Sequence, residues 1–293
     1  GRLSIRISAW RTFLDPLPVL IKQRGHHPAK DPMLHTGMLK GFMDGSLGSR
    51  TAALNAPYSD DPGNSGIPQF DQTTLNKMTI ERARAGFQIG FHAIGDRAIS
   101  MALNAFVAAE AAVPESVGYR FRIEHDQVID PRDFSRYKWL AVIASMQPNH
   151  LLTDMNWAED RIGPKRAMTS YAWKTFFDQG TVLAFGTDYP VEPITPFRGI
   201  YCAVTRKNEA GTKTYYPEQA LSINEALYAY TQASAYAEFA ETKKGKLAPG
   251  YYADLVVLDR DLTRVPPSEI LSTNVLRTVV GGRTVYLSPA MRK

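Results

Sequence analysis

Short apolar segments of strand character alternate with longer helical segments along most of this chain, and no other feature restricts its fold as strongly. Such alternation is typical of parallel βαβ units. A spacing of roughly 30 residues per unit fits a (β/α)8 barrel or an open doubly wound sheet. Strands are expected at residues 3–10, 38–46, 88–94, 120–126, 141–148 and 181–188, and helices at 72–87, 96–112, 130–139 and 168–180.

The pattern changes in the last part of the chain. Residues 222–239 have the apolar spacing of an amphipathic helix, and Ser222 and Glu225 form a capping box at its start. Residues 245–261 and 275–288 are instead rich in strand-forming residues and glycine turns. A small β domain is therefore expected to follow the α/β part.

Composition and charge narrow the class of protein. The net charge of +5 comes from Lys and Arg residues that are scattered along the 293 residues, so nucleic acid is not an expected partner. No apolar run is long enough to span a membrane. The single cysteine, Cys202, excludes an internal disulfide and fits a reducing compartment, so we expect a cytoplasmic location.

Four of the expected strands end in residues that could belong to a metal site. These residues are Lys40, His92, His125 and Asp188. In an α/β barrel the functional side chains lie at the carboxyl ends of the strands, so the four are expected to converge. Imidazole nitrogens and a carboxylate suit zinc or a similar divalent ion. Lys40 fits such a set only if it is neutral or carbamylated, because an ammonium group repels cations.

Each of these residues also has a simpler interpretation. A histidine at a strand end is commonly a hydrogen-bonded structural residue, and Asp188 before Tyr189-Pro190 is typical of a turn. Lys40 taken alone would be a surface lysine. The joint occurrence at the ends of nearly successive strands favours the metal site over these readings.

Three further residues are candidates for contact with a substrate. His150 follows an expected strand end, Trp157 could form an apolar pocket wall, and Arg161 either contacts substrate or organises a loop. Residues 55–70, rich in Pro, Gly and Asp, are the longest expected loop and could lie over a site.

Several longer motifs resemble one known family. They are "LKGFMDGSLGSRTAAL", "GFHAIGDRA", "RIEHDQVI", "SMQPNHLLTDMNWAEDRIG", "GTDYPVEPITPFRGIYCAVTR" and "GKLAPGYYADLVVLD". Together they look like the amidohydrolase superfamily, and "DGSLGSRTA" is similar to amidohydrolase family 3, which includes the N-substituted formamide deformylases. The resemblance implies a metal-dependent hydrolase on a TIM barrel with an additional β-sandwich. On this basis residues 1–243 would be part of the barrel and residues 244–293 the C-terminal part of the sandwich.

The resemblance also implies roles for single residues. His92 and His125 match metal ligands from successive strands, and Lys40 matches a bridging lysine that can be carbamylated. Asp188 matches the last-strand aspartate that binds metal and acts as general base on the attacking water. The implied cofactor is one or two divalent ions, with zinc as the expected metal.

The chain departs from the family pattern at its beginning. Family members carry a His-x-His pair on the first barrel strand, and no such pair occurs here. The first residue is Gly1, and the first strand matches a later strand of the barrel. We therefore expect a C-terminal portion of a longer protein, with the later barrel strands present and the first ones missing. An open sheet edge of this kind favours association, so a homo-oligomer is one expectation.

Two functional hypotheses follow. The first is a metal-dependent hydrolase that cleaves non-peptide carbon–nitrogen bonds of a small amide, an N-substituted formamide or a cyclic amide with a metal-activated water. The second is a non-catalytic, amidohydrolase-like binding or regulatory protein, which the lack of His-x-His favours. A third reading, a nucleotide-binding open sheet, finds no Gly-x-Gly-x-x-Gly loop in the sequence.

Overall fold

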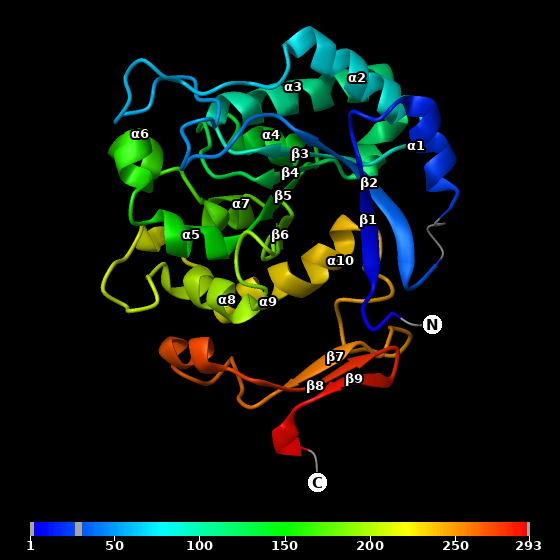
Figure 1. The fold of residues 1–293 in the computed structure, drawn as a ribbon, viewed down its shortest axis with the longest axis vertical. Coiled ribbons are helices and arrows are strands. Elements are labelled where there is room, and N and C mark those ends of the chain that lie inside the picture. Colours follow the sequence, from blue (N-terminus) through cyan, green and yellow to red (C-terminus); the bar gives the residue numbers. More distant parts are fainter. Residues whose placement is uncertain (1–2, 27–30, 292–293) are drawn as a thin grey trace. The chain divides into compact units, whose positions relative to one another are not determined.

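The larger of the two sheets has six strands, β1 to β6 (Figure 1). The computed structural model describes residues 3–26 and 31–291. In the sheet the strands follow one another in chain order, and the pairs β2–β3, β3–β4 and β4–β5 are parallel. This arrangement confirms the α/β class, whereas a closed (β/α)8 barrel stays a prediction. The strands are β1 Ile7–Thr12, β2 Leu34–Phe42, β3 Ile89–Ala93, β4 Arg122–His125, β5 Ile143–Met146 and β6 Leu183–Phe185.

Helices separate the strands as the alternation predicted. The helix predicted at residues 96–112 has these bounds in the structure, while the one predicted at 168–180 is confined to Trp173–Asp178. The helices are α1 Leu17–Arg24, α2 Gln72–Arg84, α3 Asp96–Ala112, α4 Phe134–Trp139, α5 Pro148–Asp154, α6 Ala158–Ala167, α7 Trp173–Asp178, α8 Pro196–Thr205, α9 Ile223–Tyr228 and α10 Ser234–Ala237. Shorter 3-10 turns are η1 Pro114–Tyr119, η2 Pro217–Gln219, η4 Pro267–Ser272 and η5 Pro289–Met291.

Aromatic packing on one face of the sheet decides where the polar strand-end residues point. Phe91 of β3 stacks on Phe106 of α3 with ring centroids 5.3 Å apart, and Phe106 stacks on Phe121 at 4.8 Å. All three rings are buried. Because successive side chains of a strand point to opposite faces, His92 must point away from this aromatic layer.

The helix predicted at residues 222–239 begins as expected but is interrupted. Ser222 accepts a hydrogen bond from the Glu225 amide, and the Glu225 carboxylate accepts one from the Ser222 amide, which confirms the capping box. A π-helical segment, η3 Ala229–Ala233, then separates α9 from α10. The Ser234 hydroxyl donates to the Ala229 carbonyl at 2.9 Å, so this side chain satisfies a carbonyl at the point where the α-helical ladder changes.

The last part of the chain forms the small β structure that the sequence predicted. Strands β7 Leu255–Leu258, β8 Val275–Val280 and β9 Arg283–Leu287 make a three-stranded antiparallel sheet. Gly281 and Gly282, both with positive φ, connect β8 to β9, as the tightest hairpin turns require. A complete β-sandwich stays a prediction.

The chain divides into two compact units, which are described separately below. The sheet unit contains residues 8–146 and 154–183, and the terminal unit contains the described residues of 1–7, 147–153 and 184–293. The predicted domain boundary between residues 243 and 244 stays a prediction. Within residues 3–26 and 31–291 no helix has the length and apolar character needed to cross a membrane.

Candidate metal centre

His92 and His125 lie together in the sheet unit. They stand at the ends of the neighbouring parallel strands β3 and β4, and their imidazole centroids are 4.5 Å apart with the rings nearly perpendicular. His125 is buried, and the His92 side chain is 13% exposed. Two largely buried imidazoles side by side at a strand-end edge are a donor pair suited to zinc or a similar ion.

An unusual backbone conformation makes this pairing possible. In the strand register His92 is level with Glu124, and His125 is level with Ala93. A regular strand would therefore direct His125 to the face opposite to His92. The φ angle of His125 is instead 84°, and that of Asp126 is 49°. Positive φ is uncommon for residues other than glycine and concentrates at functional sites, so the strand end is shaped to bring the second imidazole around.

The hydrogen bond between His92 and the Gly45 carbonyl indicates which ring nitrogen carries the proton. His92 Nε2 lies 3.0 Å from the Gly45 carbonyl oxygen and 3.4 Å from Asp44 Oδ1. A carbonyl oxygen can only accept, so Nε2 is the nitrogen that donates. In the neutral ring Nδ1 is then left with its lone pair and is the nitrogen able to bind a metal.

Lys40 lies on the same face of the sheet as His92, but it is level with Gly90, two residues before His92. Phe42, not Lys40, is level with His92 in the register, and Lys40 precedes Phe42 by two residues. Lys40 Nζ lies 5.5 Å from the Trp10 ring centroid and 5.2 Å from that of Phe42. Both rings are therefore within cation–π distance of the Lys40 amine. The ligand role of Lys40, with or without a carbamate, stays a prediction.

A buried polar network on the His92 face of the sheet was not predicted from the sequence. Arg122 and Glu124 of β4 form an ion pair, and Ser145 of β5 donates to Glu124 Oε2 at 2.7 Å. The Arg122 guanidinium also lies 4.6 Å from the Trp10 ring centroid. The register places Glu124 on the His92 face. The alternation of charged and apolar residues in "RFRIEH" was the available signal, because both charges fall on one face of a strand.

His150 and Asp188 lie together in the terminal unit. His150 is on α5, and Asp188 follows β6 in the loop before α8. His150 Nε2 lies 3.2 Å from Asp188 Oδ2, and since a carboxylate accepts, the imidazole donates. On its other side His150 Nδ1 is 4.0 Å from Oε1 of Glu192, which also accepts from Thr153 at 2.8 Å. The predicted substrate-contact residue is thus a hydrogen-bond partner of the predicted base.

The turn that the sequence predicted at Asp188 is present in the structure. Its carbonyl oxygen accepts from the Val191 amide at 2.8 Å, and its φ is 58°. The side chain is 37% exposed. One residue therefore closes a turn with its backbone and presents a carboxylate to His150 with its side chain.

Trp157 and Arg161 lie where the long loop 55–70 meets α6. The Arg161 guanidinium pairs with Asp60 and lies 5.6 Å from the Trp157 ring centroid. Asp60 pairs with Arg50 as well, at 2.8 Å, and these guanidinium groups hold the pKa of its carboxyl below the ordinary value. The Ser59 amide donates to the Arg161 carbonyl at 2.8 Å. These contacts give Arg161 the loop-organising role, and its contact with substrate stays a prediction.

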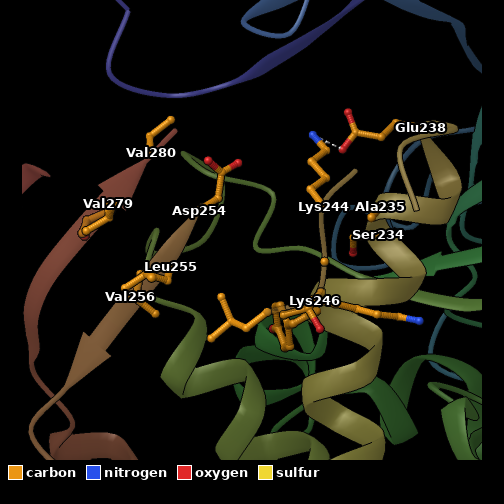
Figure 2. Close-up of a pocket in the computed structure, with 15 residues that line it drawn as sticks. Ser234, Ala235, Glu238, Lys244, Lys246, Asp254, Leu255, Val256, Val279 and Val280 are labelled. Atoms are coloured by element: carbon orange, nitrogen blue, oxygen red, sulfur yellow. Dashed lines mark ion pairs between the residues drawn. The ribbon is translucent and has the colours of Figure 1, made fainter. Parts of the chain in front are cut away.

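A cavity of about 520 Å³ lies in the terminal unit, and none of the predicted site residues is among its described lining residues (Figure 2). Its walls are largely apolar, with Leu255, Val256 and Val279 from the β7–β8 sheet. The charged pair Lys244–Glu238, 2.5 Å apart, borders it. No histidine is among its described lining residues, so these residues offer no imidazole to a metal ion.

Comparison with known proteins agrees with the resemblance of the motifs. The profile of the amidohydrolase family matches residues 2–286. The putative amidohydrolase YtcJ of Bacillus subtilis is 36% identical over 273 residues, which is 89% of this chain and 51% of that protein. An N-substituted formamide deformylase of Arthrobacter pascens is 24% identical over 258 residues, or 87% of this chain and 46% of that protein.

A solved structure is also similar to this chain. An uncharacterised metal-dependent hydrolase of Pyrococcus horikoshii superposes with a TM-score of 0.78 at 36% identity, covering 91% of this chain and 53% of that one. The chain thus spans about half the length of the relatives that it matches. With a family profile matched over nearly all its residues, this chain belongs to amidohydrolase family 3.

Proposed function

We propose that this chain is part of a metal-dependent hydrolase that cleaves carbon–nitrogen bonds other than peptide bonds. The substrate class is a small amide, an N-substituted formamide or a cyclic amide. The observation that carries the proposal is the pair of imidazoles, His92 and His125, brought to 4.5 Å by a positive φ at a strand end. Similarity to a metal-dependent hydrolase and to a formamide deformylase supports it.

His92 and His125 would hold the ion, with Asp188 and a carbamylated Lys40 as the further ligands that the family resemblance implies. Imidazole and carboxylate donors fit zinc, which is the metal that we propose. When bound, such an ion polarises a carbonyl group and lowers the pKa of water towards ~7.

Asp188 would act as the proton carrier of the reaction. Its carboxylate accepts the proton of the attacking water and then delivers it to the leaving amine, which is general acid–base catalysis. The hydrogen bond from His150 Nε2, at 3.2 Å, orients this carboxylate. His150 Nδ1 lies 4.0 Å from Glu192 Oε1, so the imidazole lies between the carboxylates of Asp188 and Glu192.

The test is hydrolysis by the complete gene product supplied with Zn²⁺. N-substituted formamides, linear amides and cyclic amides are offered, and release of amine is measured. We expect turnover that a chelator abolishes, and a kcat about 10²- to 10⁴-fold lower for Asp188→Asn. Asp178→Asn is the control, because Asp178 is an exposed carboxylate paired only with Lys174 among the described contacts.

Two outcomes would reject this proposal. Turnover that persists unchanged with the chelator would exclude a metal mechanism. Substrate binding without turnover, in protein that carries its metal, would instead support the non-catalytic binding or regulatory alternative.

A further inference from the structure

Asp44 is a fully buried carboxylate next to the His92 ring, and it is not among the site residues predicted from the sequence. Its side chain has no exposed surface. Oδ2 accepts from the Ala53 amide at 2.9 Å and from the Gly95 amide at 2.8 Å, and Oδ1 accepts from the Ile94 amide at 3.1 Å. The carboxylate therefore joins the segment after β2 to the turn between β3 and α3.

The same carboxylate faces the ring nitrogen that carries the proton. His92 Nε2 lies 3.4 Å from Asp44 Oδ1 and 3.0 Å from the Gly45 carbonyl oxygen. Gly45 is itself held in place, because its amide donates to the Thr51 carbonyl at 3.2 Å, and a Cβ at this position would lie 2.0 Å from Thr51 Oγ1. His92 thus donates towards an acceptor pair whose position is set by the loop.

We propose that Asp44 is a positioning residue of the metal centre. Together with the Gly45 carbonyl it holds His92 in one ring orientation with the proton on Nε2, and so directs Nδ1 to the ion. Carboxylate and carbonyl groups behind a ligating histidine commonly act in this way and increase metal affinity. This inference rests on the proposed function in so far as it takes His92 to be a ligand.

Asp96 provides a matched control. It is also a buried carboxylate of this region, and it also ties the same two segments together, accepting from the amides of Asn55 at 2.8 Å and Arg97 at 3.0 Å. None of its described hydrogen bonds involves His92. Asp96→Asn therefore perturbs the contacts between these two segments without changing a contact of the His92 ring.

The first measurement uses metal-free protein. Long-range ¹H–¹⁵N correlation spectra of the full chain report which nitrogen of His92 is protonated. We expect the proton on Nε2 in the wild type and in Asp96→Asn, and a mixture of both tautomers in Asp44→Asn. If Asp44→Asn does not fold, the smaller variant Asp44→Ser takes its place. A wild-type proton on Nδ1, or a variant with an unchanged tautomer, would overturn the proposal.

The second measurement is the affinity for Zn²⁺ in competition with a chelator. Loss of Asp44 is expected to weaken binding about 10- to 100-fold, the usual effect of removing such a partner. Asp96→Asn is expected to bind as the wild type does. An equal loss in both variants would show that Asp44 only stabilises the loop, and would overturn the proposal. Failure of the wild type to bind zinc would contradict the proposed function, whereas the tautomer measurement tests Asp44 without metal.

Discussion

His125 and Asp188 share a property at the scale of single residues that the sequence does not reveal. Both follow or end a strand, and both have positive φ, at 84° and 58°. Strain of this kind persists only where the surrounding structure imposes it, and it turns each side chain out of the regular alternation. The residue types at the strand ends indicate a candidate site, but the sequence does not give the direction of each side chain.

The positive φ of His125 predicts a difference in stability between two variants that both lose the imidazole. His125→Gly removes the Cβ that disfavours positive φ, whereas His125→Ala keeps it and loses the same imidazole. We expect the glycine variant to be more stable than the alanine variant by about 1 kcal/mol, with metal binding weakened in both. Denaturant unfolding of the two variants measures the difference, and equal stability would argue against strain at this position.

Glu110 of α3 gives a prediction for pH. Burial raises the pKa of Glu110 to about 7. A carboxyl whose pKa is higher in the folded chain than in the unfolded one stabilises the fold at low pH and loses this contribution as the pH rises through about 7. The wild type should therefore lose stability relative to Glu110→Gln between about pH 4.5 and pH 7. Solvent screening at this partly buried site limits the effect on the free energy of unfolding to the order of 1 kcal/mol. Denaturant unfolding of both proteins across this pH range measures the difference. If the free energies of unfolding of the two proteins change with pH in the same way, the prediction is wrong.

At the scale of elements, local signals predicted how segments begin better than how they continue. The capping box at Ser222 is present, yet the helix after it passes through a π segment where Ser234 bonds the Ala229 carbonyl. Helix α6 was not predicted, since Gly163 has a φ of 72° and is followed by Pro164, so no regular helical spacing is visible there. Asp44 was missed for a different reason, because its hydrogen-bond partners come from other segments of the chain.

The capping box can be tested by itself. Ser222→Ala removes the oxygen that accepts from the Glu225 amide, and should lower the free energy of unfolding by about 1 kcal/mol. Ser222→Thr keeps a hydroxyl and should stay close to the wild type. Chemical denaturation compares the three proteins, and an alanine variant as stable as the wild type would contradict the role of the cap.

At the scale of the whole molecule, contacts between distant segments are the part that no local pattern predicts. Arg6 and Asp254 are 248 positions apart, and both belong to the terminal unit. Their bonds measure 2.6 Å and 2.9 Å and are bidentate, and the Arg6 guanidinium also lies 4.1 Å from the Tyr252 ring centroid. The first described residues are in this way tied to the segment that leads into β7.

This long-range pair predicts a measurable coupling. A double-mutant cycle with Arg6→Gln and Asp254→Asn should give a coupling energy on the order of 1 kcal/mol, because the pair is bidentate but still partly exposed to water. Unfolding free energies of the wild type, both single variants and the double variant supply it. Strictly additive effects would mean that the two side chains stabilise the molecule independently.

The central claim is that His92 and His125 bind a divalent ion, and elemental analysis after dialysis against Zn²⁺ tests it most directly. The wild type and a His35→Ala control, altered at a histidine of β2 outside the site, should retain about one zinc ion per chain. The double variant His92→Ala/His125→Ala should retain none. Equal zinc in the double variant and the wild type, or no zinc in the wild type, would contradict the account.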